Sequence, residues 1–146
     1  MPLPEGSPAP DFSLKTTDGS TIQLSRFKGK KNVIVYFYPK DDTPGCTKEA
    51  CSFRDDLSQV LAKDSVVFGV STDNLESHNE FSKKFNLNFP LLSDPDGSIS
   101  KAYDAFNSEK GSSRRVTAVI DKEGKIKKYF AQVNPEGHSK EVLSLL

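Results

Sequence analysis

Residues 33–38 form an unbroken apolar run that is rich in β-branched and aromatic side chains. Such a run is typical of a strand that is buried on both faces of a sheet. Pro39 ends the run, because proline has no N–H group to donate to a neighbouring strand. The run therefore predicts the central strand of a sheet that other elements cover on both sides.

A helix start follows this strand after a short polar link. Thr43 suits the N-cap, because its hydroxyl can accept a hydrogen bond from the first turn, and Pro44 suits the first helical position. Cys46 then falls in the first turn, where unpaired N–H groups and the positive end of the helix dipole favour an anion. This position favours the thiolate, which is the reactive form of cysteine.

The chain has two cysteines, Cys46 and Cys51, which are five positions apart on the predicted helix. Cys51 lies about 140° round the helix from Cys46 and off its apolar face. In an intact helix their Cα atoms would be about 8 to 9 Å apart, whereas a disulfide needs roughly 4.4 to 6.8 Å. A bond between them therefore requires the first turns of the helix to open. The predicted apolar face consists of Cys46, Ala50, Phe53, Leu57, Val60 and Leu61.

Other uses of the two cysteines are open. A static structural disulfide is geometrically poor at this spacing, and buried inert thiols are an alternative. A tetrahedral zinc site is not filled by two thiols, and neither His78 nor His138 has ligand spacing to them. The Cys-x-x-Cys motif of disulfide reductases is absent.

The remaining patterns alternate between strands and helices. Residues 11–14 and 21–24 flank an Asp18-Gly19 turn and predict an N-terminal β-hairpin. Residues 65–71 predict a second buried strand, which makes a βαβ unit with the first. Further predicted elements are an extended start over 1–10, helices at 75–85, 99–106 and 136–146, a strand at 89–93, a mobile loop at 107–113 and a hairpin of 115–121 with 125–131. The period of the helix at 75–85 places His78 at the flank of its buried face. This order predicts a mixed central sheet between layers of helices, an α/β fold.

Length and charge limit the class of protein. The 146 residues fit a single domain over 1–146. A formal net charge of zero argues against nucleic-acid binding, and no apolar stretch approaches the roughly 18 residues of a membrane span. Residues 1–5 lack the basic and apolar regions of a secretory signal, so we expect a cytoplasmic protein unless a targeting segment was removed.

The string Pro39-x-x-x-Thr43-x-x-Cys46 resembles the active-site signature of the peroxiredoxins. The cysteine five positions later is similar to that of the bacterioferritin-comigratory, or Q-type, subgroup. The similarity extends over residues 9–12, 36–39, 69–72, 91–94 and 119–121. It implies a thioredoxin-like three-layer sandwich and a thiol-dependent peroxidase that reduces hydrogen peroxide and organic hydroperoxides.

The resemblance also implies roles for the two cysteines. Cys46 would attack the peroxide and become a sulfenic acid, and Cys51 would resolve it as an intramolecular disulfide. Thioredoxin, or alternatively glutaredoxin, would reduce that disulfide. No haem, flavin, selenium or metal is implied, and a monomer or weak dimer is expected. An alternative is a redox-sensing module whose Cys46–Cys51 disulfide switches partner binding.

Further site residues come from the same resemblance. The Thr43 hydroxyl would meet the peroxide, and Pro39 would shield the sulfenate from water. An arginine before residues 119–121 would hold the thiolate; Arg114 and Arg115 both stand there, and the spacing favours Arg115. Glu49 resembles a glutamate that orients this arginine.

Overall fold

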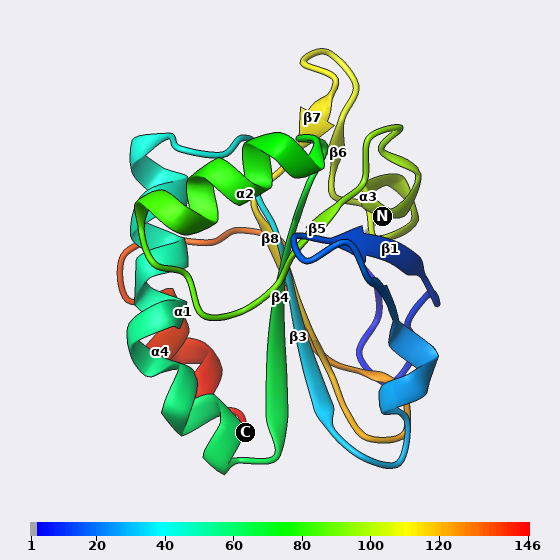
Figure 1. The fold of residues 1–146 in the computed structure, drawn as a ribbon. Coiled ribbons are helices and arrows are strands. Elements are labelled where there is room, and N and C mark those ends of the chain that lie inside the picture. Colours follow the sequence, from blue (N-terminus) through cyan, green and yellow to red (C-terminus); the bar gives the residue numbers. More distant parts are fainter. Residues whose placement is uncertain (1–2) are drawn as a thin grey trace.

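A seven-stranded mixed sheet runs through the computed structural model, which describes residues 3–146 (Figure 1). In spatial order the strands are β2 (Thr21–Gln23), β1 (Ser13–Thr16), β5 (Leu91–Ser93), β4 (Ser65–Ser71), β3 (Asn32–Phe37), β8 (Val116–Ile120) and β9 (Ile126–Phe130). Strands β3, β4 and β5 are parallel, while β1 and β8 run antiparallel to β5 and β3. Strands β2 and β9 pair antiparallel at the two edges.

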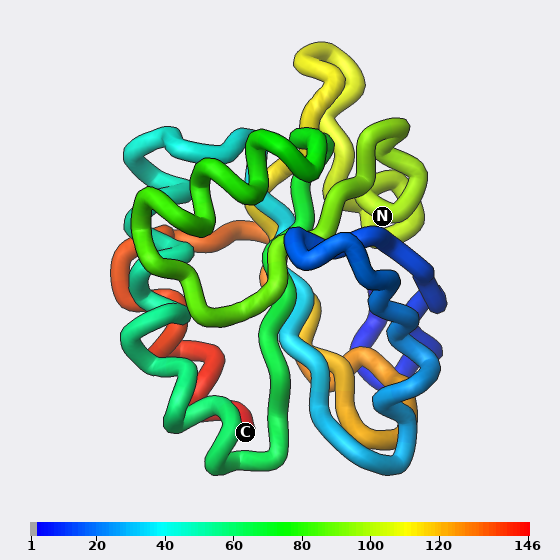
Figure 2. Tube along the Cα trace, in the orientation of Figure 1, coloured from blue at the N-terminus to red at the C-terminus, as the bar shows by residue number. Residues whose placement is uncertain are grey.

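Two apolar layers cover the sheet, as the alternation of side chains along β3 requires. Ile34 and Tyr36 pack against the layer of helices α1 (Pro44–Ala62), α2 (Leu75–Lys84) and α4 (His138–Leu143). Val33 and Phe37 face the other layer, which includes the N-terminal segment, the 3₁₀ helix η1 (Leu24–Phe27) and the region of α3 (Ser98–Ala102). Figures 1 and 2 show these helices on opposite sides of the sheet. The predicted α/β sandwich with an N-terminal hairpin is confirmed.

The carboxyl edge of the sheet is where the chain passes from β3 to α1. Strand β3 ends at Phe37, residues 38–43 form the link, and α1 begins at Pro44. The chain returns through β4, which is parallel to β3, so the predicted βαβ unit is confirmed. Parallel strands β3, β4 and β5 all end at this edge, the usual place for a site in an α/β sheet.

Several predicted boundaries are wrong. The expected loop at 107–113 contains a second, two-stranded sheet of β6 (Phe106–Asn107) and β7 (Ser112–Ser113). Asp104 has a left-handed backbone (φ 53°), so the helix predicted at 99–106 ends before Phe106. Gly137 has φ 81°, so the last helix starts at His138 and not at residue 136.

The predicted apolar face of α1 needs one correction. Leu61, expected in the core, is 49% exposed, because it lies in the last turn and at the side of the buried stripe. Phe53 and Val60 of the same stripe are fully buried. Met1 and Pro2, part of the predicted extended start, lie outside the described residues. Within residues 3–146, no helix is long and apolar enough to cross a membrane.

Candidate active site

Cys46 lies in the first turn of α1, at the carboxyl edge of the sheet. The Thr47 N–H donates to the Thr43 carbonyl at 2.8 Å, so the Cys46 N–H precedes the ladder of helical hydrogen bonds. The Cys46 residue is only 1% exposed. Its sulfur has therefore lost most of its contact with water and depends on protein groups to stabilise a charge.

Arg115 supplies the positive charge beside this sulfur. Its Nη2 lies 3.4 Å from Cys46 Sγ, and its Nη1 donates to Glu49 Oε1 at 2.8 Å. Residue 115 directly precedes β8, and Val116 pairs with Phe37 at the end of β3. The pairing of β8 with β3 thus brings Arg115 next to the start of α1.

Arg114, the other candidate, points elsewhere. Its Nη2 donates to the carbonyl of Asp104, and the same nitrogen lies 3.6 Å from the Asp104 carboxylate. The Arg114 side chain is 42% exposed, against 20% for Arg115. The structure therefore places Arg115, and not Arg114, against the thiol.

Gly45 makes room for this guanidinium. A Cβ atom at position 45 would lie 3.0 Å from Arg115 Nη2, which is tighter than an ordinary contact. A side chain here would push the arginine away from Cys46. The sequence did not identify this role, since a glycine in the first turn of a helix has no distinctive pattern.

Glu49 is a fully buried carboxyl group one helical turn after Cys46. Burial raises its pKa to about 7, although the adjacent charge of Arg115 acts in the opposite direction. Burial alone would lower the pKa of Arg115, but the charges of Cys46 and Glu49 outweigh it and raise that pKa. Within residues 3–146, Glu49 Oε2 has no hydrogen-bond partner. The carboxyl group orients Arg115 through Oε1 alone.

The raised pKa of Glu49 predicts a pH dependence of stability. The carboxyl group of Glu49 has a pKa of 4.5 in its ordinary state and about 7 in the folded protein. Between these two pH values the folded state binds a proton at Glu49 more tightly than the unfolded state does. The free energy of unfolding therefore falls as the pH rises through this window. We expect Glu49→Gln to remove this component, so that urea unfolding at pH 5 and at pH 8 differs less than in the wild type. Glu80→Gln, an exposed change on α2, is the control; equal profiles for all three proteins would contradict the assignment.

Thr43 occupies the N-cap position of α1, but its side chain does not cap the helix. The hydroxyl instead donates to the Lys40 carbonyl at 3.0 Å, within the loop before the helix. The predicted side-chain cap is therefore wrong. Pro39, where the chain bends after β3, is half-buried at the start of the same loop.

Cys51 is a free, half-buried thiol on the same intact helix. Beyond it, α1 is tied to its neighbours. Arg54 Nη1 donates to the Phe85 carbonyl at 2.6 Å, and Ser139 Oγ donates to Asp56 Oδ2 at 2.7 Å. The first two turns, which carry both cysteines, lack such ties to α2 or α4 among the hydrogen bonds of residues 3–146.

Tyr36 belongs to the site although the sequence did not single it out. It is buried on the α1 face of β3, and its ring stacks on Phe53 with 4.9 Å between centroids. Burial, and then the charges of Glu49 and Cys46, raise the pKa of the Tyr36 hydroxyl well above its ordinary value. The alternation along residues 33–38 could have placed this ring beneath α1.

A buried cysteine at a helix N-terminus, held by an arginine at the edge of an α/β sheet, defines a class of thiol-based redox enzymes. A model of the AhpC/TSA family matches residues 6–129. The chain belongs to this family, the peroxiredoxins.

Individual relatives show which subgroup of the peroxiredoxins this chain resembles. The chain is 44% identical to "Putative peroxiredoxin bcp" of Coxiella burnetii over 152 residues, which cover 100% of both chains. It is 46% identical to "Peroxiredoxin Q, chloroplastic" of Populus jackii over 147 residues, 97% of this chain and 67% of the relative. A crystal structure of a mutant PrxQ of Xylella fastidiosa has a TM-score of 0.91 at 30% identity, covering 99% of this chain and 95% of that chain.

These similarities confirm three predictions: the resemblance to the Q-type subgroup, the thioredoxin-like fold and the activity of a thiol-dependent peroxidase. The family acts on peroxides and uses reductants of the thioredoxin type. The roles of individual residues depend on the local geometry around Cys46.

Proposed function

We propose that Cys46 is the peroxidatic cysteine and Cys51 the resolving cysteine of a thioredoxin-dependent peroxidase. The observation that carries this assignment is the 3.4 Å contact between Arg115 Nη2 and Cys46 Sγ at the start of α1. A guanidinium and a helix N-terminus together favour a thiolate on a sulfur that is otherwise buried. Cys51 has no such contact with a cation among the described residues.

In the first step the Cys46 thiolate attacks the terminal oxygen of the hydroperoxide. A sulfur–oxygen bond forms, the O–O bond breaks, and the alkoxide or hydroxide that leaves takes up a proton. Sulfur gives up two electrons and Cys46 becomes a sulfenic acid. Arg115 and the Cys46 N–H would stabilise the negative charge as it moves from sulfur onto the two oxygens.

The Thr43 hydroxyl is suited to orient the peroxide. Its hydrogen is committed to the Lys40 carbonyl at 3.0 Å, so its oxygen is left as an acceptor. An acceptor fits the O–H group of a hydroperoxide, while Arg115 offers donors to the other side. Pro39, which opens the same loop, would shield the sulfenic acid from water.

In the second step the Cys51 thiol attacks the Cys46 sulfenic acid, which forms a disulfide and releases water. The helix must open between the two cysteines, because their spacing on an intact helix is too wide for a disulfide. The contacts of Arg54 and Asp56 support opening that is limited to the first turns of α1. An external dithiol then reduces the disulfide.

We propose thioredoxin as this reductant and glutaredoxin as the second candidate. Hydrogen peroxide and organic hydroperoxides are the proposed substrates; a solved structure of the 32% identical bacterioferritin comigratory protein of Xanthomonas campestris concerns the alkyl peroxide reduction activity of that protein. We further propose one domain over residues 1–146, a monomer or weak dimer, and a cytoplasmic location. Relatives from plants are named chloroplastic, so a plastid location is the alternative.

The test of the resolving role is Cys51→Ser. We expect this variant to form one sulfenic acid per chain on Cys46 but to lose thioredoxin-supported turnover, because no disulfide can form. Turnover is measured as NADPH oxidation with thioredoxin and thioredoxin reductase. Mass spectrometry after one equivalent of peroxide should show an internal disulfide in the wild type and a sulfenic acid in the variant.

Two outcomes would redirect the proposal. Normal cycling of Cys51→Ser with thioredoxin would remove Cys51 from the mechanism. A wild-type chain that forms the disulfide but scarcely oxidises NADPH would be a redox sensor, whose Cys46–Cys51 bond changes a partner surface.

A further inference from the structure

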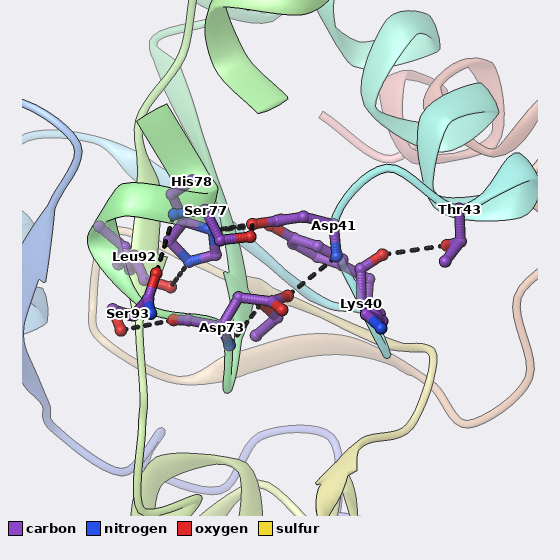
Figure 3. Close-up of polar contacts among 11 residues, drawn as sticks. Lys40, Asp41, Thr43, Asp73, Ser77, His78, Leu92 and Ser93 are labelled. Atoms are coloured by element: carbon purple, nitrogen blue, oxygen red, sulfur yellow. Dashed lines mark hydrogen bonds and ion pairs between the residues drawn. The ribbon is translucent and has the colours of Figure 1, made fainter. Parts of the chain in front are cut away.

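A buried hydrogen-bond network holds the loop between β3 and α1, and Asp41 is its centre (Figure 3). Asp41 Oδ1 accepts a hydrogen bond from the Tyr38 hydroxyl at 2.6 Å. Asp41 Oδ2 accepts one from the Ser77 hydroxyl at 2.8 Å and lies 2.7 Å from His78 Nδ1. His78 is completely buried, whereas the sequence placed it at the flank of the buried face of α2.

The partners of His78 determine where its protons are. Its Nε2 lies 2.9 Å from the carbonyl oxygen of Leu92, which can only accept, so Nε2 carries a hydrogen. Its Nδ1 faces the Asp41 carboxylate, whose other two partners are hydroxyl donors. A hydrogen therefore lies between Nδ1 and Oδ2, and the contact is a buried hydrogen bond between His78 and Asp41.

The loop backbone is fixed as well. The Asp41 N–H donates to Asp73 Oδ2 at 2.9 Å, and the same oxygen accepts a hydrogen bond from Ser71 Oγ at 2.6 Å. Potential metal-ligand atoms of Asp41, Asp73 and His78 lie within 4.8 Å of one another. Both carboxylates and both ring nitrogens already have hydrogen-bond partners within the protein, so the cluster fits a structural network rather than a cation site.

This network acts on the loop that leads to the reactive cysteine. Asp42, the next residue, has φ 57°, a left-handed conformation that Asp adopts more readily than most residues other than glycine. The buried contacts of Asp41 fix the backbone immediately before this turn. On the other side of Asp41, the Lys40 carbonyl accepts a hydrogen bond from the Thr43 hydroxyl. Helix α1 starts at the next residue after Thr43, Pro44.

We infer that His78 is a positioning residue for peroxide reduction. Through the hydrogen bond between its Nδ1 and Asp41 Oδ2, it holds the loop of residues 38–43 so that the Thr43 hydroxyl and the N-terminus of α1 meet the peroxide at Cys46. His78 itself touches neither the sulfur nor the substrate. The inference rests on the proposed role of Cys46 and adds a residue from α2 to the machinery that serves it.

Two amide substitutions separate the contacts of His78. The side-chain nitrogen of asparagine can replace Nδ1, whereas that of glutamine can replace Nε2. His78→Asn keeps the donor to Asp41, and His78→Gln keeps the donor to Leu92. We expect His78→Gln to lower the rate constant of Cys46 with peroxide by about 10²-fold, the effect of a small misplacement of reacting groups. His78→Asn should retain most of the wild-type rate constant.

A second readout distinguishes positioning from general damage to the fold. Alkylation of Cys46 by iodoacetamide needs a thiolate but not the donors and acceptors that orient a peroxide. His78→Gln should therefore lose far more peroxide reactivity than alkylation rate. Ser65→Ala, which removes a buried hydroxyl at the opposite end of β4, is the matched control and should leave the ratio of the two rates unchanged.

Ser77→Ala provides an independent variant if His78→Gln does not fold. It removes another donor to Asp41 Oδ2 and should reduce the peroxide rate constant more than the alkylation rate. Equal peroxide rates for His78→Asn and His78→Gln, or a parallel fall of both rates in Ser77→Ala, would overturn the inference. A wild-type Cys46 that reacts slowly with peroxide would instead overturn the proposed function, so the two failures are distinguishable.

Discussion

Replacing Cys46 with serine is expected to abolish peroxide consumption. A serine hydroxyl keeps the size of the residue and its N–H, but it is not ionised at neutral pH, even beside Arg115. Oxygen also cannot accept the peroxide oxygen as sulfur does when it becomes a sulfenic acid. The measurement is peroxide consumption with thioredoxin, thioredoxin reductase and NADPH, together with the intact mass of the chain after peroxide treatment.

Cys51→Ser is the matched control for this experiment, because it removes the other thiol from the same helix. That variant should still consume one equivalent of peroxide, whereas Cys46→Ser should consume none above the rate of the buffer. Sustained turnover by Cys46→Ser, or a sulfenic acid on its Cys51 at the wild-type rate, would show that the peroxidatic cysteine had been misassigned.

The position of the reactive cysteine could be predicted because its signals are local. An apolar strand, Pro39 and a helix that starts with Pro44 occupy a short stretch of chain, and each has a known effect on the backbone. The structure has the strand, the loop and the helix in this order, with Cys46 in the first turn. Residue propensities and hydrophobic periodicity are sufficient to predict secondary structure where neighbouring residues determine it.

The groups around the sulfur could be predicted only in part, because they come from distant segments. Arg114 and Arg115 are adjacent in the sequence, and only the pairing of β8 with β3 determines which of them faces Cys46. Threonine is a common N-cap residue, yet the conformation of the loop directs the Thr43 hydroxyl to the Lys40 carbonyl. Family resemblance, not periodicity, favoured Arg115.

The hydrogen-bond network around Asp41 was still harder to predict from the sequence. Its members come from the link after β3, the end of β4, the first turn of α2 and strand β5. No short stretch contains the pattern, and a histidine among apolar positions of a helix has no sequence feature that reveals its partner. The helical period placed His78 near the buried face, but the identity of Asp41 as its partner depends on tertiary packing.

The other large effect is expected for Arg115→Ala, which removes the guanidinium from both Cys46 and Glu49. The thiol should lose part of its thiolate form at neutral pH, and the charge that develops on the peroxide oxygens loses a fixed donor. Removing one such donor typically lowers the rate by about 10² to 10³-fold. Stopped-flow measurement of Cys46 oxidation gives the peroxide rate constant, and alkylation across a pH series gives the thiolate titration.

Arg114→Ala is the matched control, since it removes the same side chain from the adjacent position, where the arginine contacts Asp104. Its peroxide rate constant should stay close to that of the wild type. Arg115→Lys should recover only part of the rate, because one ammonium group cannot contact the sulfur and Glu49 with the geometry of a guanidinium. A greater loss in Arg114→Ala than in Arg115→Ala would move the cation of the site to Arg114.

Loss of activity in Arg115→Ala must be separated from loss of stability, because the variant leaves the Glu49 carboxyl buried without its partner. Removing one member of a buried ion pair typically costs about 3 to 5 kcal/mol, and Glu49 can reduce this cost by binding a proton, since its pKa is already raised to about 7. Arg115→Ala combined with Glu49→Gln removes the stranded acid. We expect the double variant to regain stability in urea unfolding at pH 8 but not peroxide reactivity, because the charge that stabilises the thiolate is still missing. Recovery of both properties together would mean that Arg115 serves the fold and not the reaction.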